Sequence, residues 1–255
     1  DLHSFPTRRS SDLYSSPDEI ERKYSINLAL AVAEWMETKV NLVDTPGYLD
    51  FTGDALAGVY AADGALIVCS GTAGVEVGTE KVWEYCEQRG LPRMLCVSLM
   101  DKEHADFERV FRQIKERLTP KVIPVEIPVG EGPAFHGIIN LFSKQCHLYK
   151  KGTKAGEYDE VPIPDEYRAR FEKYTQELTE AIAATDDTLL ERYLGGEEIG
   201  RDEAIAAMKA GMARGGLFPL FCASGELTYG TRALLSKMVE LFPSPAMNRD
   251  RKSVV

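Results

Sequence analysis

The alternation of strand-length apolar runs with helical patterns is the feature that most constrains how this chain can fold. Three such runs, at residues 64–70, 93–101 and 219–224, are typical of strands buried on both faces of a parallel sheet. Helical patterns separate them, and two of these patterns end at the stop signals Gly90 and Pro243. Strands that alternate with helices form βαβ crossovers, so the sequence predicts an α/β fold with a doubly wound sheet.

Two segments depart from this alternation. Residues 25–44 contain two short apolar runs separated by polar residues, which predicts a β-hairpin. The stretch before residue 218 holds a strand-like run, a polar hairpin candidate and two helical segments rich in Glu, Ala and Leu. We therefore expect an inserted α+β subdomain at 124–215, between a first part of the sheet domain at 14–123 and its last strand and helix at 216–245.

The composition limits the classes of partner. The formal net charge of −10 argues against a broad nucleic-acid-binding face, and we expect no sequence-specific nucleic-acid binding. No apolar run approaches the length needed to span a bilayer, so we expect no membrane partner. The five cysteines form no CxxC pair, which favours buried reduced thiols and a cytoplasmic location. They are Cys69, Cys86, Cys96, Cys146 and Cys222.

The stretch NLVDTPGYLDF (41–51) carries the strongest chemical signal. A buried strand ends in Asp44, and ligands of α/β sheets bind beyond the carboxyl ends of the strands. A carboxylate at this point can hold Mg²⁺ through water, and Gly47 lets a backbone N–H approach a phosphate oxygen. Taken alone, the tetrapeptide DTPG is also compatible with an ordinary turn, because Pro and Gly favour turns.

Two later strand ends favour a nucleotide site over three unrelated turns. Asp101 ends the run 93–101, where its carboxylate can accept two N–H bonds from a purine edge. The third strand end offers Ser224 and the backbone of Gly225 for a base carbonyl. All three loops belong to the same edge of one sheet, which is where such folds bind their ligands.

In their order, spacing and amino-acid sequence, these motifs resemble the translational GTPases, and most closely the elongation factor G group. DTPGYLDFTGD is similar to that group's DTPGHVDFT, FHGIINLF resembles the start of its insert, and LLSKMVELFPSP resembles the end of its GTPase domain. The resemblance covers nearly all of residues 18–245. It implies a P-loop-type GTPase fold with an inserted subdomain, GTP or GDP and Mg²⁺ as ligands, and the ribosome as partner. We expect the protein to be a monomer.

The resemblance also assigns roles to individual residues. It implies that Asp44 holds Mg²⁺ through water, that Gly47 senses the γ-phosphate and that Asp101 reads the guanine. ERKYSIN stands where the family has ERGITIT, so Ser25 replaces the switch threonine that binds Mg²⁺ and keeps its hydroxyl. The positions expected to bind nucleotide are Asp44, Thr45, Pro46, Gly47, Ser98, Leu99, Met100, Asp101, Ser224 and Gly225.

Three departures from the family pattern shape the expected activity. Tyr48 stands where the family has its hydrolytic His, and a phenol positions water poorly, so we expect slower or differently triggered hydrolysis. Ser98 and Leu99 replace an Asn and a Lys, which predicts weaker contacts to the base, while Asp101 still favours guanine over adenine. No G-x-x-x-x-G-K-[ST] occurs in the sequence, so the fold is expected to lack its first strand and P-loop.

The two ends of the chain share an unusual relationship at the level of codons. One DNA segment can encode both ends of the chain: one of its strands encodes Asp250–Val255, and the opposite strand encodes Thr7–Asp12. Such a relationship is typical of a sequencing adapter that has been read in both directions. We therefore expect residues 1–13 to be an adapter artefact, and residues 246–255 to be a linker followed by the same artefact.

These expectations combine into one function with alternatives. We expect the GTP-binding domain fragment of an elongation factor G-like translational GTPase that acts in ribosomal translocation with GTP hydrolysis. The intact parent is expected to be the active GTPase, and this chain to be inactive because the phosphate cradle is absent. The alternatives are a GTPase of ribosomal protection or assembly, and a non-hydrolysing ribosome-binding module, which Tyr48 and SLMD (98–101) favour.

Overall fold

Four parallel strands form the central sheet. The computed structural model describes residues 16–153 and 156–245, and the expected tail segments 1–13 and 246–255 lie outside them. In spatial order the strands are β3 (Ala65–Ser70), β4 (Arg93–Ser98), β10 (Phe218–Cys222) and β5 (Val122–Pro124). The last strand, β10, returns to lie between β4 and β5. This arrangement confirms the expected α/β fold with a parallel sheet.

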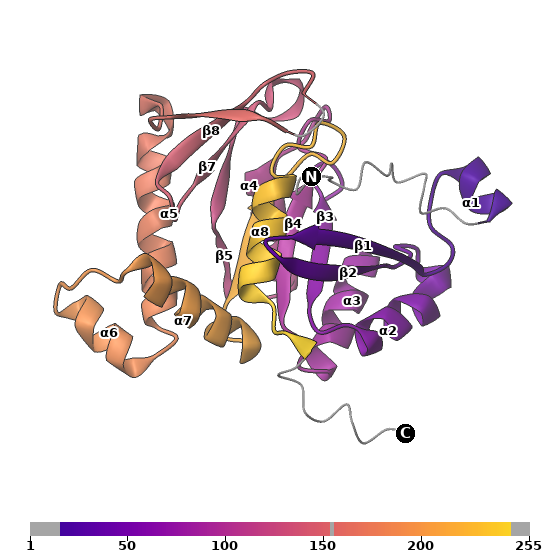
Figure 1. Ribbon diagram of the computed structural model, residues 1–255, viewed down its shortest axis with the longest axis horizontal. Coiled ribbons are helices and arrows are strands. Elements are labelled where there is room, and N and C mark those ends of the chain that lie inside the picture. The colour runs from indigo at the N-terminus through magenta and orange to yellow at the C-terminus, as the bar shows by residue number, and fades with distance from the viewer. Residues whose placement is uncertain (1–15, 154–155, 246–255) are drawn as a thin grey trace.

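Helices follow the strands and cover the sheet (Figure 1). α2 (Thr52–Ala61) packs on α3 (Val77–Gln88), and α3 packs on β3. α4 (Phe107–Arg117) follows β4, and α8 (Thr231–Leu241) follows β10. On α4 the buried residues recur at helical spacing along one face, which is the reason this segment is a helix: Phe107, Val110, Phe111 and Ile114.

The predicted hairpin is present at the start of the described chain. After the short helix α1 (Pro17–Arg22), β1 (Ala29–Trp35) pairs antiparallel with β2 (Thr38–Asp44). The two turn residues between them, Met36 and Glu37, both have positive φ, as a tight two-residue hairpin turn requires. Within the described ranges the hairpin is a separate two-stranded sheet and is not hydrogen-bonded into the four-stranded one.

A second sheet, antiparallel throughout, follows directly from the first. Its order is β6 (Glu126–Val129), β7 (Gly137–Asn140), β8 (Gln145–Tyr149) and β9 (Tyr158–Val161). Only Val125 separates β5 from β6. Its N–H donates to the Leu220 carbonyl at 3.0 Å, and its carbonyl accepts from the Leu141 N–H at 3.1 Å. The chain therefore passes from one sheet into the other in one extended segment that is bonded to both.

The expectation of two helices in the insert is wrong, because its described residues form three. They are α5 (Asp165–Ala183), α6 (Asp187–Leu194) and α7 (Arg201–Ala213). In Figure 1, α5 lies beside β7 and β8, whereas α6 and α7 lie below these strands, and α7 packs against β10 and α8. The break between the first two comes from Asp186. Its side chain accepts the N–H groups of Thr188 and Leu189 at 3.0 and 3.2 Å, and so begins a new helix.

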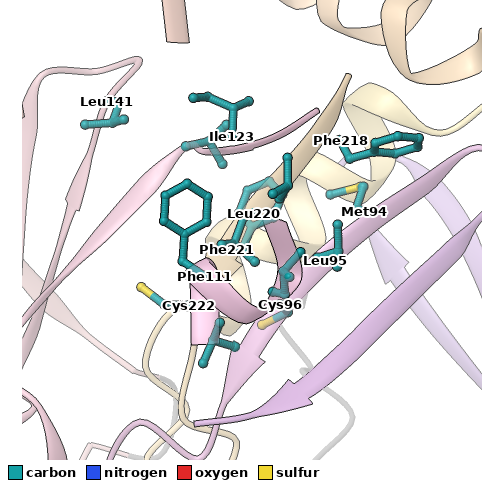
Figure 2. Packing of buried hydrophobic residues seen from close by; sticks show 14 of the residues in the cluster. Met94, Leu95, Cys96, Phe111, Ile123, Leu141, Phe218, Leu220, Phe221 and Cys222 are labelled. Atoms are coloured by element: carbon teal, nitrogen blue, oxygen red, sulfur yellow. The ribbon is translucent and has the colours of Figure 1, made fainter. Parts of the chain in front are cut away.

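The hydrophobic core is continuous across both sheets. Figure 2 shows Leu95 and Cys96 of β4 beside Leu220 and Phe221 of β10, with Phe111 of α4 close by. The same buried cluster includes residues of the insert on β6, β7 and α5. All five cysteines are buried, in keeping with their apolar surroundings in the sequence. The insert therefore shares its core with the parallel sheet.

Candidate functional site

The loops after β3, β4 and β10 meet at the carboxyl edge of the parallel sheet. The Gly71 N–H donates to the Ser98 carbonyl at 2.7 Å, which joins the first loop to the second. The Met100 N–H donates to the Ala223 carbonyl at 3.3 Å, which joins the second loop to the third. The alignment of parallel strands brings these loops together, because their carboxyl ends lie at one edge.

Asp101 has a carboxylate that protein groups satisfy only in part. Its side chain is 11% exposed, and its Oδ2 lies 3.5 Å from the Lys102 ammonium. Its Oδ1 is buried and has no hydrogen-bond partner among the residues that the structure describes. Lys102 also pairs with Glu226 of the third loop, so one cation connects both loops. The protein therefore leaves this buried acceptor unsatisfied.

The three residues before Asp101 play different parts. Ser98 contributes its backbone carbonyl to the contact with Gly71. Leu99 has φ of 59° and is 40% exposed, a left-handed conformation that is uncommon for a residue other than glycine. Met100 is fully buried, and its carbonyl accepts the Gly132 N–H at 2.9 Å. Leu99 is therefore the residue of this segment whose side chain extends toward solvent.

Ser224 and Gly225 begin the third loop, and Ser224 shapes it. Ser224 is fully buried, its Oγ accepts the Leu227 N–H at 3.1 Å, and its own N–H donates to the Tyr229 carbonyl at 2.9 Å. A side chain at Gly225 would meet no atom within 4 Å. The loop is closed by Ser224 and leaves open space beside Gly225.

Asp44 and Ser25, the two expected metal ligands, lie side by side. The Ser25 hydroxyl donates to Asp44 Oδ2 at 3.2 Å. Burial raises the pKa of the Asp44 carboxyl, the Ser25 hydrogen bond opposes this rise, and the nearby charge of Glu19 adds to it. The pair thus presents two oxygens and an incompletely compensated negative charge.

The residues that follow Asp44 pack against α2 and α3. The Thr45 methyl lies 2.5 Å from where a Cβ would stand on Gly58 of α2, so only glycine fits there. Pro46 is buried, and the Gly47 carbonyl lies 2.7 Å from the corresponding point on Gly78. These contacts fix the backbone of the loop by close approach to two helices.

Tyr48 projects from this loop. Its side chain is 57% exposed, and its ring centroid lies 4.7 Å from that of Tyr24, with the rings tilted by 55°. Tyr48 also precedes the short 3-10 helix η2 (Leu49–Phe51). The aromatic pair places the position expected for hydrolysis next to the segment that carries Ser25.

Glu19 is a functional candidate that the sequence analysis missed. It is 1% exposed, and one carboxylate oxygen accepts the N–H groups of Ile26 and Asn27 at 2.8 and 2.9 Å. Its other oxygen accepts the Ser16 N–H at 2.9 Å in a capping box at α1. The spacing Ser16-x-x-Glu19 is a recognisable capping-box signal, but only the tertiary structure reveals that Glu19 also organises the Ser25 segment.

The expected site residues therefore form two groups. One holds Ser25, Asp44 and Tyr48, and the other holds the loops of Asp101 and Ser224. The connection between the groups is indirect, through the Gly47 carbonyl at the start of α3 and the loop after β3. The first group offers oxygens suited to a cation, and the second offers an acceptor and open space suited to a base.

A parallel α/β sheet with loops meeting at its carboxyl edge, together with an antiparallel insert, is consistent with a GTPase domain that carries an inserted subdomain. The chain belongs to the family described as "Elongation factor Tu GTP binding domain", which matches residues 4–244. This family assignment places it among the translational GTPases.

A solved structure is also similar to this chain. It is the crystal structure of a protein from Thermus thermophilus, which is 34% identical to this chain and superposes with a TM-score of 0.85. The match covers 94% of this chain and 36% of that one, so this chain spans about a third of the length of the Thermus protein.

Neither a metal cluster nor a membrane span is found in the described residues. In residues 16–153 and 156–245 no group of three or more His, Cys, Asp or Glu side chains is placed to hold a metal ion. None of the helices in the described part of the chain is long and apolar enough to cross a membrane.

Proposed function

We propose that this chain is the guanine-nucleotide-binding domain of an elongation factor G-like translational GTPase. The observation that carries the proposal is the buried Asp101 Oδ1 without a partner among the described residues. A buried acceptor left unpaired costs about 1–3 kcal/mol, and guanine presents two N–H donors that a carboxylate can accept. Adenine lacks that pair of donors, so Asp101 favours guanine. Ser98, Leu99 and Met100 precede Asp101 in the same segment and are assigned with it to nucleotide binding.

The loop after β10 accommodates the rest of the base in this proposal. Ser224 holds the loop closed through Leu227 and Tyr229, and the space beside Gly225 receives the base carbonyl. Lys102 supports both loops, because it pairs with Asp101 and with Glu226. Base recognition is therefore assigned to the two loops that are hydrogen-bonded to each other.

The residues present fit a Mg²⁺ ion at Ser25 and Asp44. The pKa of Asp44 is raised mainly by burial, so a nearby cation would stabilise its charged form. Two protein oxygens suffice, because Mg²⁺ keeps several waters and takes further oxygens from phosphates. When bound, the ion neutralises phosphate charge, while Thr45, Pro46 and Gly47 position the backbone that faces the phosphates.

Tyr48 occupies the hydrolytic position in this assignment. Its phenol is exposed and packs on Tyr24, which leaves it able to reach an attacking water but without an imidazole to orient it. We therefore propose slower or differently triggered GTP hydrolysis. In the full-length protein, ribosome-stimulated turnover equal to that of an ordinary elongation factor, and unchanged by Tyr48→Phe, would contradict this role.

The remaining parts of the assignment concern the intact protein. The chain spans 36% of the Thermus protein and has no P-loop motif, which supports a fragment of a longer GTPase. We propose that the parent is a cytoplasmic monomer that acts on the ribosome in translocation, and that this chain alone hydrolyses no GTP. Because the phosphate cradle is absent, calorimetry should detect no micromolar GTP binding by this chain. A micromolar Kd would contradict the proposal.

The base site can be tested in the chain itself, because nucleoside monophosphates depend little on a phosphate cradle. In NMR titrations, GMP should shift the amides of residues 98–102 and 223–230 at lower concentration than AMP. Asp101→Asn should lose this preference and gain binding of xanthosine monophosphate, because an amide N–H₂ can donate to the xanthine 2-oxygen. Glu103→Gln, an exposed position two residues away, is the matched control.

The outcome that would refute the base site is equal response to GMP and AMP in the unmodified chain.

Two alternative functions keep the same fold. A non-hydrolysing ribosome-binding module is favoured by Tyr48 together with Leu99, whose exposed apolar side chain provides no cation over a base. Ribosome binding by the full-length protein without GTP turnover would support it. A ribosomal protection or assembly GTPase would instead hydrolyse GTP without promoting translocation.

A further inference from the structure

Two tyrosine hydroxyls of the insert accept backbone N–H groups beside the two proposed base loops. Tyr149 on β8 accepts the Gly230 N–H at 2.8 Å, and Tyr167 on α5 accepts the Gly130 N–H at 2.9 Å. Both glycines have positive φ, of 80° and 72°, so each marks a turn with a fixed direction. The first bond therefore joins the insert to the end of the Ser224 loop, whereas the second lies within the insert, close to Gly132, whose N–H donates to the Met100 carbonyl.

The Tyr149 contact is the more direct of the two. Gly230 ends the loop that starts at Ser224 and precedes the first residue of α8. The Tyr149 ring stacks on the Tyr229 ring at 4.4 Å between centroids and 9° between planes. The Tyr229 carbonyl in turn accepts the Ser224 N–H. One side chain of the insert thus contacts both residues at the closing end of the loop.

Gly230 is packed so closely that no residue with a side chain fits at this position. A Cβ at this residue would stand 2.5 Å from the Cys222 carbonyl and 2.8 Å from Ile138 Cδ1 on β7. Burial raises the pKa of the Tyr149 phenol, with the charge of Glu126 adding to the rise, so the hydroxyl is neutral at pH 7. A neutral hydroxyl held against a fixed glycine amide is a stable acceptor.

We infer that Tyr149 is a positioning residue, which holds the loop 224–230 in the shape that receives the base carbonyl and so makes base affinity depend on the insert. The inference rests on the proposed function of this loop and deepens it. Tyr149 does not contact the base in this assignment. It acts through Gly230 and Tyr229.

One substitution separates the contribution of the Tyr149 hydroxyl from that of its ring. Tyr149→Phe keeps the stacking on Tyr229 and removes the acceptor of the Gly230 N–H. A neutral hydrogen bond contributes about 0.5–1.5 kcal/mol, so GMP binding should weaken by about two- to twelvefold. Hydrogen exchange at the Gly230, Leu227 and Ser224 amides should become faster, while exchange at the core strands stays unchanged.

The test compares GMP with 2-aminopurine ribonucleoside monophosphate in NMR titrations of the full chain. The analogue keeps the 2-amino group but lacks both the 6-oxygen that faces the loop and the N1–H, so it binds more weakly than GMP in every variant, and the comparison is of the change that Tyr149→Phe causes for each ligand. Tyr149→Phe should reduce the initial slope of the GMP titration and leave that of the analogue unchanged. Tyr158→Phe is the control, because its ring also packs near Tyr149, on the adjacent strand, and is 36% exposed.

The outcomes separate this inference from the function on which it rests. If the unmodified chain does not distinguish GMP from AMP, the proposed base site is refuted, and the inference with it. If it does, and Tyr149→Phe binds GMP with unchanged affinity, the inference alone is refuted. Equal weakening of GMP and the analogue, with faster exchange throughout the core, would show a purely structural role and would also overturn it.

Discussion

Replacing Glu126 by Gln should remove the main source of pH-dependent stability in this fold. Glu126 lies on β6 where the two sheets meet and is 1% exposed. Neither carboxyl oxygen has a hydrogen-bond partner of ordinary geometry among the described residues. Burial raises the pKa of Glu126 from 4.5 to about 8, and the Cys222 backbone and the Lys237 charge offset only part of this rise.

The sign of the effect follows from which state holds the proton. Between pH 4.5 and 8 the folded chain keeps a proton on Glu126 that the unfolded chain has released. The stabilisation is therefore complete below about pH 4.5 and is lost as the pH rises toward 8. At about 1.4 kcal/mol per pH unit, this window of about 3.5 units corresponds to a loss of about 5 kcal/mol as an upper limit.

Urea unfolding followed by tryptophan fluorescence at pH 5, 6.5 and 8 measures this loss. The free energy of unfolding of the unmodified chain should fall between pH 5 and 8. That of Glu126→Gln should fall by several kcal/mol less, because glutamine has no proton to release. At pH 8 the variant should be the more stable protein. At pH 5 it should be equal or less stable, because a buried amide has its own unmet hydrogen bonds.

Other titrating groups do not obscure the comparison. The pKa values of Asp44 and Glu131 are also raised by burial and act with the same sign, whereas the lowered pKa of His147 acts with the opposite sign. These groups are common to both proteins and cancel in the difference. Glu172→Gln, at an exposed position on α5, is the control. Parallel pH profiles of the unmodified chain and Glu126→Gln would refute the reasoning.

Three further substitutions test the local structure. Gly58→Ala should lower the free energy of unfolding by about 1–3 kcal/mol because its Cβ would strike Thr45, whereas Gly53→Ala, on the same helix in open space, should raise it by up to about 1 kcal/mol. Denaturant titrations that rank the two alanines in the reverse order would contradict this packing. Glu19→Ala should speed hydrogen exchange at the Ile26 and Asn27 amides, and unchanged exchange relative to the exposed control Glu21→Ala would argue against its role. Asp186→Ala should cost about 1 kcal/mol through loss of the α6 cap, with the neighbouring Asp187→Ala having a smaller effect on the same measurement.

Local patterns in the sequence were sufficient for β3, β4, β10, the β1–β2 hairpin and most of the helices, but not for β5 and β8. β4 is buried along nearly its whole length, and its apolar run could hardly belong to any element but a central strand. The break between α5 and α6 is not among the predicted features, although residues 185–188 are polar and weak helix formers. A single cap at Asp186 competes there with helix propensity, and propensity alone does not decide the outcome.

The sequence by itself determined which chemical groups stand at the ends of the strands, because each strand and the residue after it are adjacent in the chain. Only the tertiary structure decided how those groups are satisfied. Asp101 Oδ1 is left without a partner among the described residues, Glu19 is directed to the Ser25 segment, and Tyr149 reaches Gly230 across 81 residues. These contacts depend on strand register and sheet packing, which set the distances between residues far apart in the chain. No local sequence pattern predicts such distances.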